Sequence, residues 1–196
     1  MNTKLWLVIT LVPLLASVTV STEAKEVKLA HKGKARCVIV VRPGWADGVK
    51  VPKELPAQAK GIVQKRRKIF VESVKDLAHY LGKMSGTEIE IVEALPPRDR
   101  RTPIYLGAAA EAVFGEVGIS KAGMFGFRVV VDRRRGIGLY GESEVATSYA
   151  IYELLHRLGC RWFMPTELGE VVPERPTLAV PFMDEKLAPV AENRSM

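Results

Sequence analysis

Gly136, Gly138 and Gly141 have the spacing G-x-G-x-x-G, which in dinucleotide-binding folds lets backbone amides approach a pyrophosphate. That chemistry requires the glycines to follow a strand directly and to open a helix. Here three arginines, residues 133–135, separate them from the preceding apolar run, and the residues between the glycines have the pattern of a strand. No acidic residue ends the next strand, where a ribose-binding carboxylate would be needed. We therefore predict a hairpin strand and no nucleotide site.

Metal and covalent chemistry also lack their usual patterns. His31, His79 and His156 have no neighbouring ligands, and neither C-x-x-C nor H-E-x-x-H occurs. A metal site needs several such ligands at set spacing. The G-x-S-x-G turn that exposes a nucleophilic serine is absent as well. The sequence thus predicts no metal, no cofactor and no nucleophilic triad.

The adjacent carboxylates Asp184 and Glu185 suit general acid–base chemistry by residue type. Such chemistry on a glycosidic bond needs two carboxyl groups that flank the bond, or one acid plus a carboxylate that holds a substrate amide. This dipeptide lies next to Lys186, near the C-terminus, with no framing motif. We interpret it as part of a solvated linker, so we expect no catalytic residue in the chain.

Two basic runs, residues 65–68 and 133–135, contribute to a net charge of +7. A nucleic-acid surface usually combines such charge with interleaved aromatic side chains. Only Phe70 lies near the first run, and it falls on an apolar helix stripe. We expect a solvated helix face and a hairpin tip, and no nucleic-acid partner; a basic protein outside the cytoplasm can instead meet anionic polysaccharide or a membrane surface.

The first 24 residues have the composition of a secretory signal peptide. A single lysine, Lys4, precedes an apolar run from Leu5 to Val20, and Thr22 and Ala24 are placed like a cleavage site. The alternative is an uncleaved N-terminal membrane anchor. Both interpretations place the rest of the chain outside the cytoplasm, secreted or periplasmic.

The 196 residues are enough for one domain with short tails. Cys37 and Cys160 are the two cysteines, too few for a disulfide scaffold. Both fall in apolar, strand-like runs, so one bridge and two buried thiols both remain open.

Hydrophobic periodicity predicts the elements that must form the body of this domain. We expect a long amphipathic helix over 62–81, a short helix over 108–114 and a helix from Ser143 that stops at Gly159, with a surface excursion over 43–59. Strands are expected at 35–41, 88–92, 103–107, 127–131, 137–140, 160–164, 171–172 and 178–182. Strands outnumber helices and two of them form a hairpin, which favours an α/β (α+β) fold, a two-layer sandwich of a mixed sheet with helices mainly on one face.

One stretch has a more specific pattern. The helix over 146–158 runs into Leu158-Gly159-Cys160-Arg161-Trp162-Phe163-Met164-Pro165, followed by Gly169-Glu170-Val171-Val172-Pro173. This resembles the end of the N-terminal α/β domain of bacterial α-glucuronidases and β-hexosaminidases. The early β-run, the helix that ends near Gly86, and Pro103-Ile104-Tyr105-Leu106-Gly107 agree more loosely. The resemblance covers about residues 25–182.

In that family the domain precedes a (β/α)₈ barrel that carries the catalytic carboxylates. The resemblance therefore implies a signal peptide over 1–24, the N-terminal-like domain over 25–182, and a linker over 183–196 toward a barrel that this chain lacks. The chain is then expected to be a fragment, a non-catalytic accessory domain of a glycoside hydrolase whose partner barrel lies in cis or in a neighbouring gene. Arg161, Trp162, Phe163 and Pro165 are the expected barrel contact, with core packing an equal alternative for Trp162 and Phe163.

The alternative function is a free-standing glycan-binding module. Such a module needs exposed aromatic side chains along a groove. Trp45, in the excursion rich in proline and glycine, is the candidate contact, and a tryptophan tucked onto the surface is the alternative for it.

Overall fold

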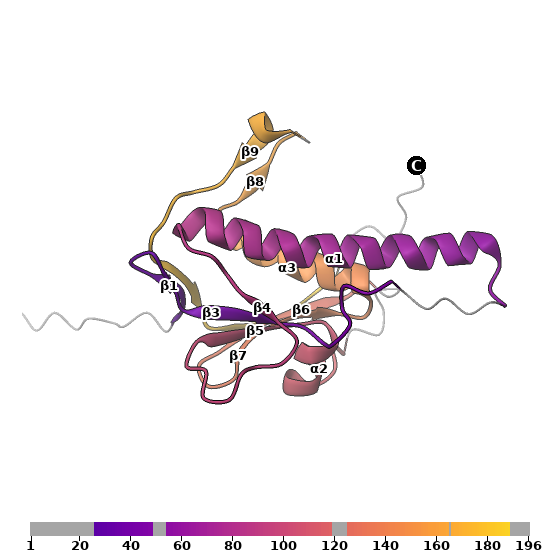
Figure 1. Cartoon of the computed structure of the whole chain (residues 1–196), viewed down its shortest axis with the longest axis horizontal. Helices are drawn as coiled ribbons and strands as arrows, with labels where there is room; N and C mark the ends of the chain where they lie inside the picture. Colours follow the sequence, from indigo (N-terminus) through magenta and orange to yellow (C-terminus); the bar gives the residue numbers. More distant parts are fainter. Residues whose placement is uncertain (1–25, 49–53, 119–124, 165, 189–196) are drawn as a thin grey trace, which may run out of the picture.

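The computed structural model describes residues 26–48, 54–118, 125–164 and 166–188. Its centre is a mixed six-stranded sheet in the order β11-β6-β7-β5-β3-β4 (Figure 1). These strands are β3 (Cys37–Val40), β4 (Ile91–Val92), β5 (Thr102–Leu106), β6 (Phe127–Asp132), β7 (Gly136–Gly141) and β11 (Met183–Leu187). The strands from β7 to β4 run parallel, while β6 is antiparallel to both β7 and β11. The predicted hairpin over 127–140 is thus confirmed.

Two helices cover one face of this sheet (Figure 1). Helix α1 (Ala57–Ser85) ends at Gly86, whose φ of 71° lies in the left-handed region that favours glycine. Helix α3 (Glu144–Leu158) begins at Ser143, whose hydroxyl accepts a hydrogen bond from the backbone amide of Ala146. It ends at Gly159, as predicted. The main core fills the layer between these helices and the sheet and includes Leu77, Leu81, Ile104, Leu139, Ile151 and Leu154.

The short helix α2 (Ala108–Phe114) lies on the opposite face. It forms a second, smaller core cluster of Ala110, Phe114, Val117, Val130 and Tyr140. The predicted fold class, a mixed sheet with helices mainly on one face, is therefore confirmed, with α2 as a small third layer.

A second sheet of three strands lies at one end of the molecule (Figure 1). It has the order β10-β1-β2, from β1 (Glu26–His31), β2 (Lys34–Ala35) and β10 (Leu178–Pro181). Val27, Leu29, Leu178 and Val180 from this sheet join the main core. The two sheets therefore share one hydrophobic interior.

The structure corrects several predicted boundaries. Residues 183–187, assigned to a linker, form strand β11, which is hydrogen-bonded to β6 along its whole length. Helix α1 begins at Ala57, inside the predicted excursion 43–59. The strand predicted over 160–164 is reduced to Arg161–Trp162 and lies outside both larger sheets.

The predicted signal peptide, residues 1–24, lies outside the described residues. Within the described part of the chain, no helix combines the length and the apolar character that crossing a bilayer requires.

Candidate functional site

The predicted contact residues lie on a small projection that we call the arm, residues 161–171. It consists of strand β8 (Arg161–Trp162), the 3₁₀-helix η1 (Glu167–Gly169) and strand β9 (Glu170–Val171). The two strands pair antiparallel and form a sheet of their own. In Figure 1 the arm stands on the far side of α1 and α3 from the main sheet. Pro165 lies outside the described residues.

Apolar side chains on the arm face solvent. Leu168 is 94% exposed and Phe163 is 75% exposed, and about half of the surface of Met164 and Val171 is open. Large apolar side chains that gather on one projection differ from the scattered exposed hydrophobic residues of an ordinary surface, and they mark sites of association. For Phe163 the structure therefore favours a surface position over core packing.

Trp162 anchors the arm on the helices beneath it. Its indole packs edge-on against Tyr80 of α1 and Tyr152 of α3, with ring centroids 5.2 Å and 5.6 Å apart. The indole Nε1 donates a hydrogen bond of 3.1 Å to the hydroxyl of Tyr80, and the hydroxyl of Tyr152 donates one of 2.6 Å to Asp76. Such aromatic pairs contribute about 0.5–1.5 kcal/mol beyond burial. Trp162 therefore anchors the arm and also contributes to its exposed surface, since 38% of the residue is exposed.

The two tyrosines keep their protons under ordinary conditions. Burial raises the pKa of Tyr152, and hydrogen bonding to the Asp76 carboxylate raises the same pKa further. Burial is also the main reason that the pKa of Tyr80 is raised, and the nearby Glu170 carboxylate raises it too. Neither phenol is therefore suited to act as a base, and both serve as packing and hydrogen-bonding groups.

Arg161 has a structural role at the base of the arm. Its Nη1 donates hydrogen bonds to the carbonyl oxygens of His156 and Cys160, at 2.6 Å and 2.7 Å. These interactions satisfy backbone carbonyls where α3 ends. On the second strand, Glu170 forms an ion pair with Lys83 at 3.2 Å. Both strands of the arm are thus tied to a helix.

Tight packing of the arm requires a glycine at position 169. A Cβ added there would lie 2.5 Å from the backbone nitrogen of Met164 and 2.7 Å from its carbonyl oxygen. Hydrogen bonds across the same point join the Phe163 amide to the Gly169 carbonyl and the Gly169 amide to the Thr166 carbonyl. The tip is therefore a closed turn that holds its apolar side chains outward.

Trp45, the predicted glycan contact, lies in the loop after β3. Its side chain is half-buried and packs against the main core, and its carbonyl oxygen accepts a hydrogen bond of 3.2 Å from Arg67. A groove runs beside this loop, lined by Ala46, Asp47, Gly48, Gln64, Arg67, Lys68, Val71, Glu72 and Lys75. Trp45 is not among these lining residues.

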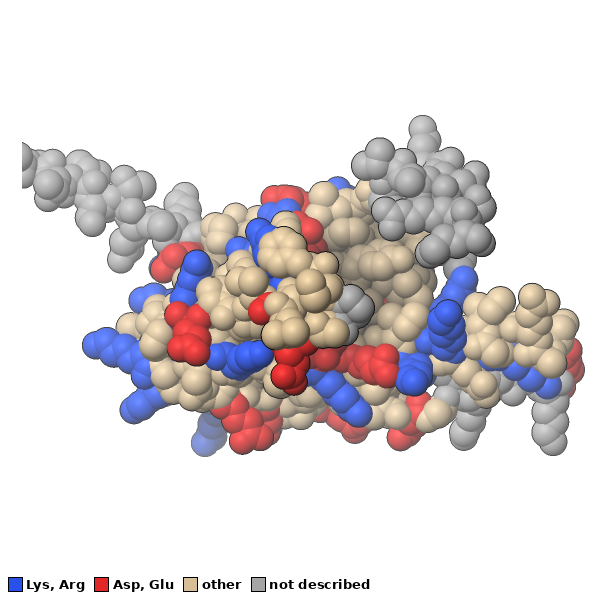
Figure 2. Space-filling view, turned by 90° about the horizontal axis from the view of Figure 1, so that it is seen from above, with Lys and Arg blue, Asp and Glu red and all other residues tan. Residues whose placement is uncertain are grey.

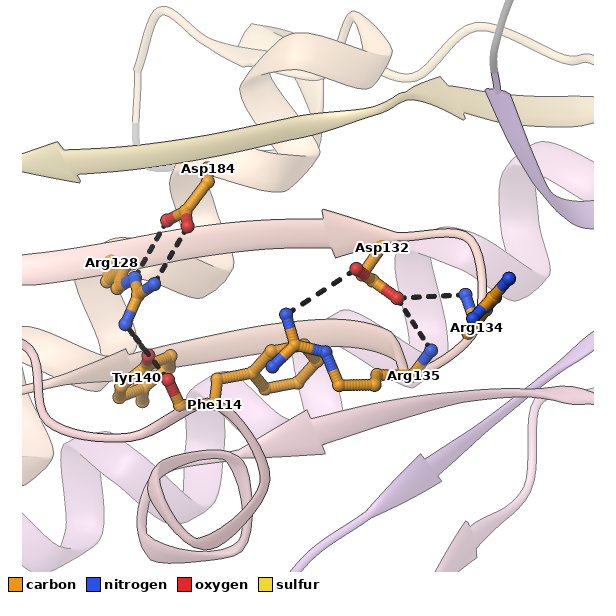
Figure 3. A network of polar contacts seen from close by, with 7 residues as sticks. All are labelled: Phe114, Arg128, Asp132, Arg134, Arg135, Tyr140 and Asp184. Carbon is orange, nitrogen blue, oxygen red and sulfur yellow. Dashed lines mark hydrogen bonds and ion pairs between the residues drawn. The ribbon is translucent and has the colours of Figure 1, made fainter.

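The carboxylate Asp184 belongs to a polar network on the α2 face of the sheet (Figure 3). The guanidinium of Arg128 donates two hydrogen bonds to this carboxylate, at 2.7 Å and 2.8 Å. It donates a third to the hydroxyl of Tyr140. Arg128 holds the pKa of Asp184 below its ordinary value. Nearby, Arg135 lies over the ring of Phe114 at 4.8 Å. The network ties β6, β7 and β11 together.

Glu185 faces the opposite side of the same strand, since neighbouring residues of a strand alternate. It forms an ion pair with Arg157 of α3 at 2.7 Å, which lowers the pKa of its carboxyl. Asp184 and Glu185 are therefore separated by the sheet and are each paired with an arginine. They do not form the carboxylate pair that bond cleavage would need.

Other reactive groups are buried or dispersed. Within the described residues, no group of three or more His, Cys, Asp or Glu side chains is placed to hold a metal ion. Cys37 and Cys160 are free, buried thiols. Burial raises the pKa of Cys37 to about 12. The predicted G-x-G-x-x-G segment is strand β7, so its glycines open no helix and bind no phosphate by that mechanism.

Sequence reasoning missed Tyr80, Tyr152 and Leu168 as parts of this surface. Tyr152 lies in α3, and its ring contacts Trp162. Tyr80 has no sequence signal that pairs it with a residue 82 positions away.

Comparison with known proteins adds evidence on the fold. No model of a known protein family matches the chain, and no curated protein sequence matches it. Solved structures do match, among them a family GH115 4-O-methyl-α-glucuronidase described as specific for decorated arabinogalactans. The TM-score is 0.57 at 13% sequence identity, over 85% of this chain. The chain spans 19% of that structure. It therefore shares its fold with one segment of a glycoside hydrolase.

Proposed function

We propose that this chain is a non-catalytic accessory domain of an exported carbohydrate-active enzyme, and that its arm docks onto a catalytic domain. The observation that carries the proposal is the arm itself, whose apolar side chains are held outward on a base anchored by Trp162. The fold supports a relation to carbohydrate-active enzymes, because the same architecture forms one segment of a much longer α-glucuronidase. The N-terminal composition supports export.

The chemistry of the arm indicates the kind of partner. Phe163, Met164, Leu168 and Val171 offer apolar contact area, whereas Glu170 and Arg161 are already bound within the domain. Aromatic and methionine side chains are enriched in the cores of protein interfaces. We therefore assign the arm to a protein partner with an apolar recess, a (β/α)₈ barrel in cis or from a separate chain.

Docking is tested with the double variant Phe163→Ser and Leu168→Ser. We expect the purified domain to bind an apolar fluorescent dye and to self-associate, and the double variant to lose most of both. A catalytic barrel encoded beside this gene should bind the wild-type domain, and the double variant should bind at least about tenfold more weakly. Ile62→Ser is the matched control, since Ile62 is 48% exposed on α1, away from the arm. Equal effects of both variants, or a monomer that binds neither dye nor barrel, would overturn the proposal.

The non-catalytic part of the proposal has its own test. The purified domain should not hydrolyse aryl glycosides or aryl glucuronides above the buffer rate. Turnover that disappears in Asp184→Asn or Glu185→Gln would show that the chain itself is the enzyme.

A further inference from the structure

A basic groove lies at the end of the molecule where the small sheet meets the main sheet. It encloses about 400 Å³ and is lined by Glu26, Val27, Lys28, His31, Arg36, Arg100, Thr102 and Arg133. These residues come from β1, from the segment before β3, from the start of β5 and from the tip of the β6–β7 hairpin. Lys and Arg side chains project from this end of the molecule in Figure 2, at the left, where Figure 1 places β1.

The cations of this groove have no anionic partner within the described part of the chain. The side chains of Lys28, Arg36, Arg100 and Arg133 form neither an ion pair nor a hydrogen bond there. Arg101 next to them provides the contrast, because its guanidinium is held by both Asp99 and Glu90. Four positive charges therefore line the groove opposite a single carboxylate, that of Glu26.

The pKa of His31 is sensitive to the positive charges of the groove. Its Nδ1 atom is buried and has no hydrogen-bond partner in the described residues. Burial lowers the pKa of His31, and the positive charges of Lys28, Lys32 and Arg36 lower it further. The imidazole is thus neutral at pH 7 and lies in a positive field that an anion would relieve.

We propose that this groove binds the carboxylate groups of an acidic polysaccharide. Guanidinium groups bind carboxylates through paired hydrogen bonds, and three arginines from three different segments converge on the groove. No Phe, Tyr or Trp side chain lines it, so it lacks the stacking platform that single-stranded nucleic acid usually uses. The choice of a polysaccharide rests on the proposed function, whereas the attraction of an anion rests on the groove alone.

Sodium polygalacturonate is a suitable probe, with neutral dextran of the same length as the comparison. We expect binding to polygalacturonate that weakens steeply between about 50 and 200 mM salt, because exposed charges are screened over roughly 8–10 Å. Dextran should not bind. Failure to bind polygalacturonate at 50 mM salt, or equal binding to dextran, overturns the proposal.

The triple variant Arg36→Gln, Arg100→Gln and Arg133→Gln should bind polygalacturonate about tenfold more weakly or worse. The matched control is the triple variant Lys65→Gln, Arg66→Gln and Lys75→Gln, which removes an equal number of positive charges from α1. It should change the affinity for polygalacturonate by no more than about twofold. An equal loss of affinity in both variants would show that net charge alone attracts the polygalacturonate, and would overturn the assignment of the groove as its binding site. Single-stranded DNA that binds more tightly than polygalacturonate would overturn the assignment to a polysaccharide.

The pKa of His31, followed by NMR, gives a second measurement. It should rise when the groove is saturated with polygalacturonate, while His79 and His156 serve as internal references. An unchanged His31 pKa at saturation places the ligand elsewhere and overturns the proposal. Phe163→Ser with Leu168→Ser should bind polygalacturonate normally, so failure of docking by the arm and failure of this site can be told apart.

Discussion

The indole of Trp162 meets the ring of Tyr80 edge-on and donates its Nε1 hydrogen to the Tyr80 hydroxyl at 3.1 Å. This one contact joins the arm to the second-to-last turn of α1. Because the arm makes no sheet contact with the rest of the domain in the described residues, its position above the helices depends on this contact together with the Trp162–Tyr152 packing and the Lys83–Glu170 ion pair.

Tyr80→Phe should loosen the arm without unfolding the domain. The substitution removes the acceptor for the indole while keeping the ring, so we expect a loss of about 0.5–1.5 kcal/mol in the free energy of unfolding. Urea unfolding measures this loss, and faster cleavage within the arm by a protease measures the local effect. Tyr105→Phe is the control, since its hydroxyl has no hydrogen bond in the described structure. Equal proteolysis of both variants would contradict the anchoring role.

Gly138 and Gly61 should respond to alanine in opposite ways. A Cβ at Gly138 would lie 2.6 Å from the ring of Phe114, whereas one at Gly61 of α1 would have nothing within 4 Å. We expect Gly138→Ala to cost about 1–3 kcal/mol through overpacking. Gly61→Ala should stabilise the domain by about 0.5–1 kcal/mol through helix propensity. Thermal unfolding of the pair checks both values, and a tolerated Gly138→Ala would show that the strand does not pack closely on α2.

The Asp184–Arg128 pair should give a defined acid dependence. Arg128 lowers the pKa of Asp184 below its ordinary value of 3.8. The stabilisation is therefore complete above that ordinary value and is lost as the pH falls through the lower, native-state pKa. Asp184→Asn should be less stable than wild type at pH 7, and the difference should vanish near pH 2.

Urea midpoints measured from pH 2 to pH 7 test this dependence. Glu88→Gln is the control, because Glu88 is exposed and forms no ion pair in the described residues. A difference between wild type and Asp184→Asn that stays constant with pH would exclude the ion pair as its source.

The two cysteines should be inert in the native protein. With a pKa of about 12, Cys37 is a thiolate in only about one molecule in ten thousand at pH 8. We expect a thiol reagent to modify neither cysteine in the folded protein and both after denaturation. Counting the modified cysteines after denaturation without a reductant tests for a disulfide. A bridge between Cys37 and Cys160 would leave neither thiol free to react.

Trp45→Ala should act on stability. Because the side chain packs against the main core, its removal should cost about 1–2 kcal/mol in urea unfolding. Affinity gels with neutral polysaccharides provide the second measurement. Retardation that Trp45→Ala abolishes at unchanged stability would instead support a glycan-binding module.

Patterns within single segments predicted much of this fold. The 3.6-residue stripe of α1, the serine that caps α3 and the hairpin over 127–140 all follow from local chemistry, and the structure confirms them. Gly159 ends α3 at the predicted point, whereas α1 continues past the predicted range 62–81 to Ser85 and is capped by Gly86. These features need no knowledge of distant residues.

Strand β11 shows what local patterns do not reveal. Its sequence, Met-Asp-Glu-Lys-Leu, is mostly charged and was assigned to a linker. Its two carboxylates are neutralised by Arg128 and Arg157, which lie 56 and 28 positions away in the chain. A strand that depends on such distant partners has no local signature. The arm was missed as a separate unit for the same reason, because its anchor Tyr80 lies far away in the sequence.

The pairing of β1 with β10, and of β6 with β11, has a consequence for synthesis. Each of the two larger sheets holds a strand whose neighbour lies within residues 178–187. While the ribosome is still making the preceding residues, β1 and β6 both present unpaired backbone groups to the solvent. The nascent chain therefore completes the hydrogen bonding of both sheets only after residues 178–187 have been made.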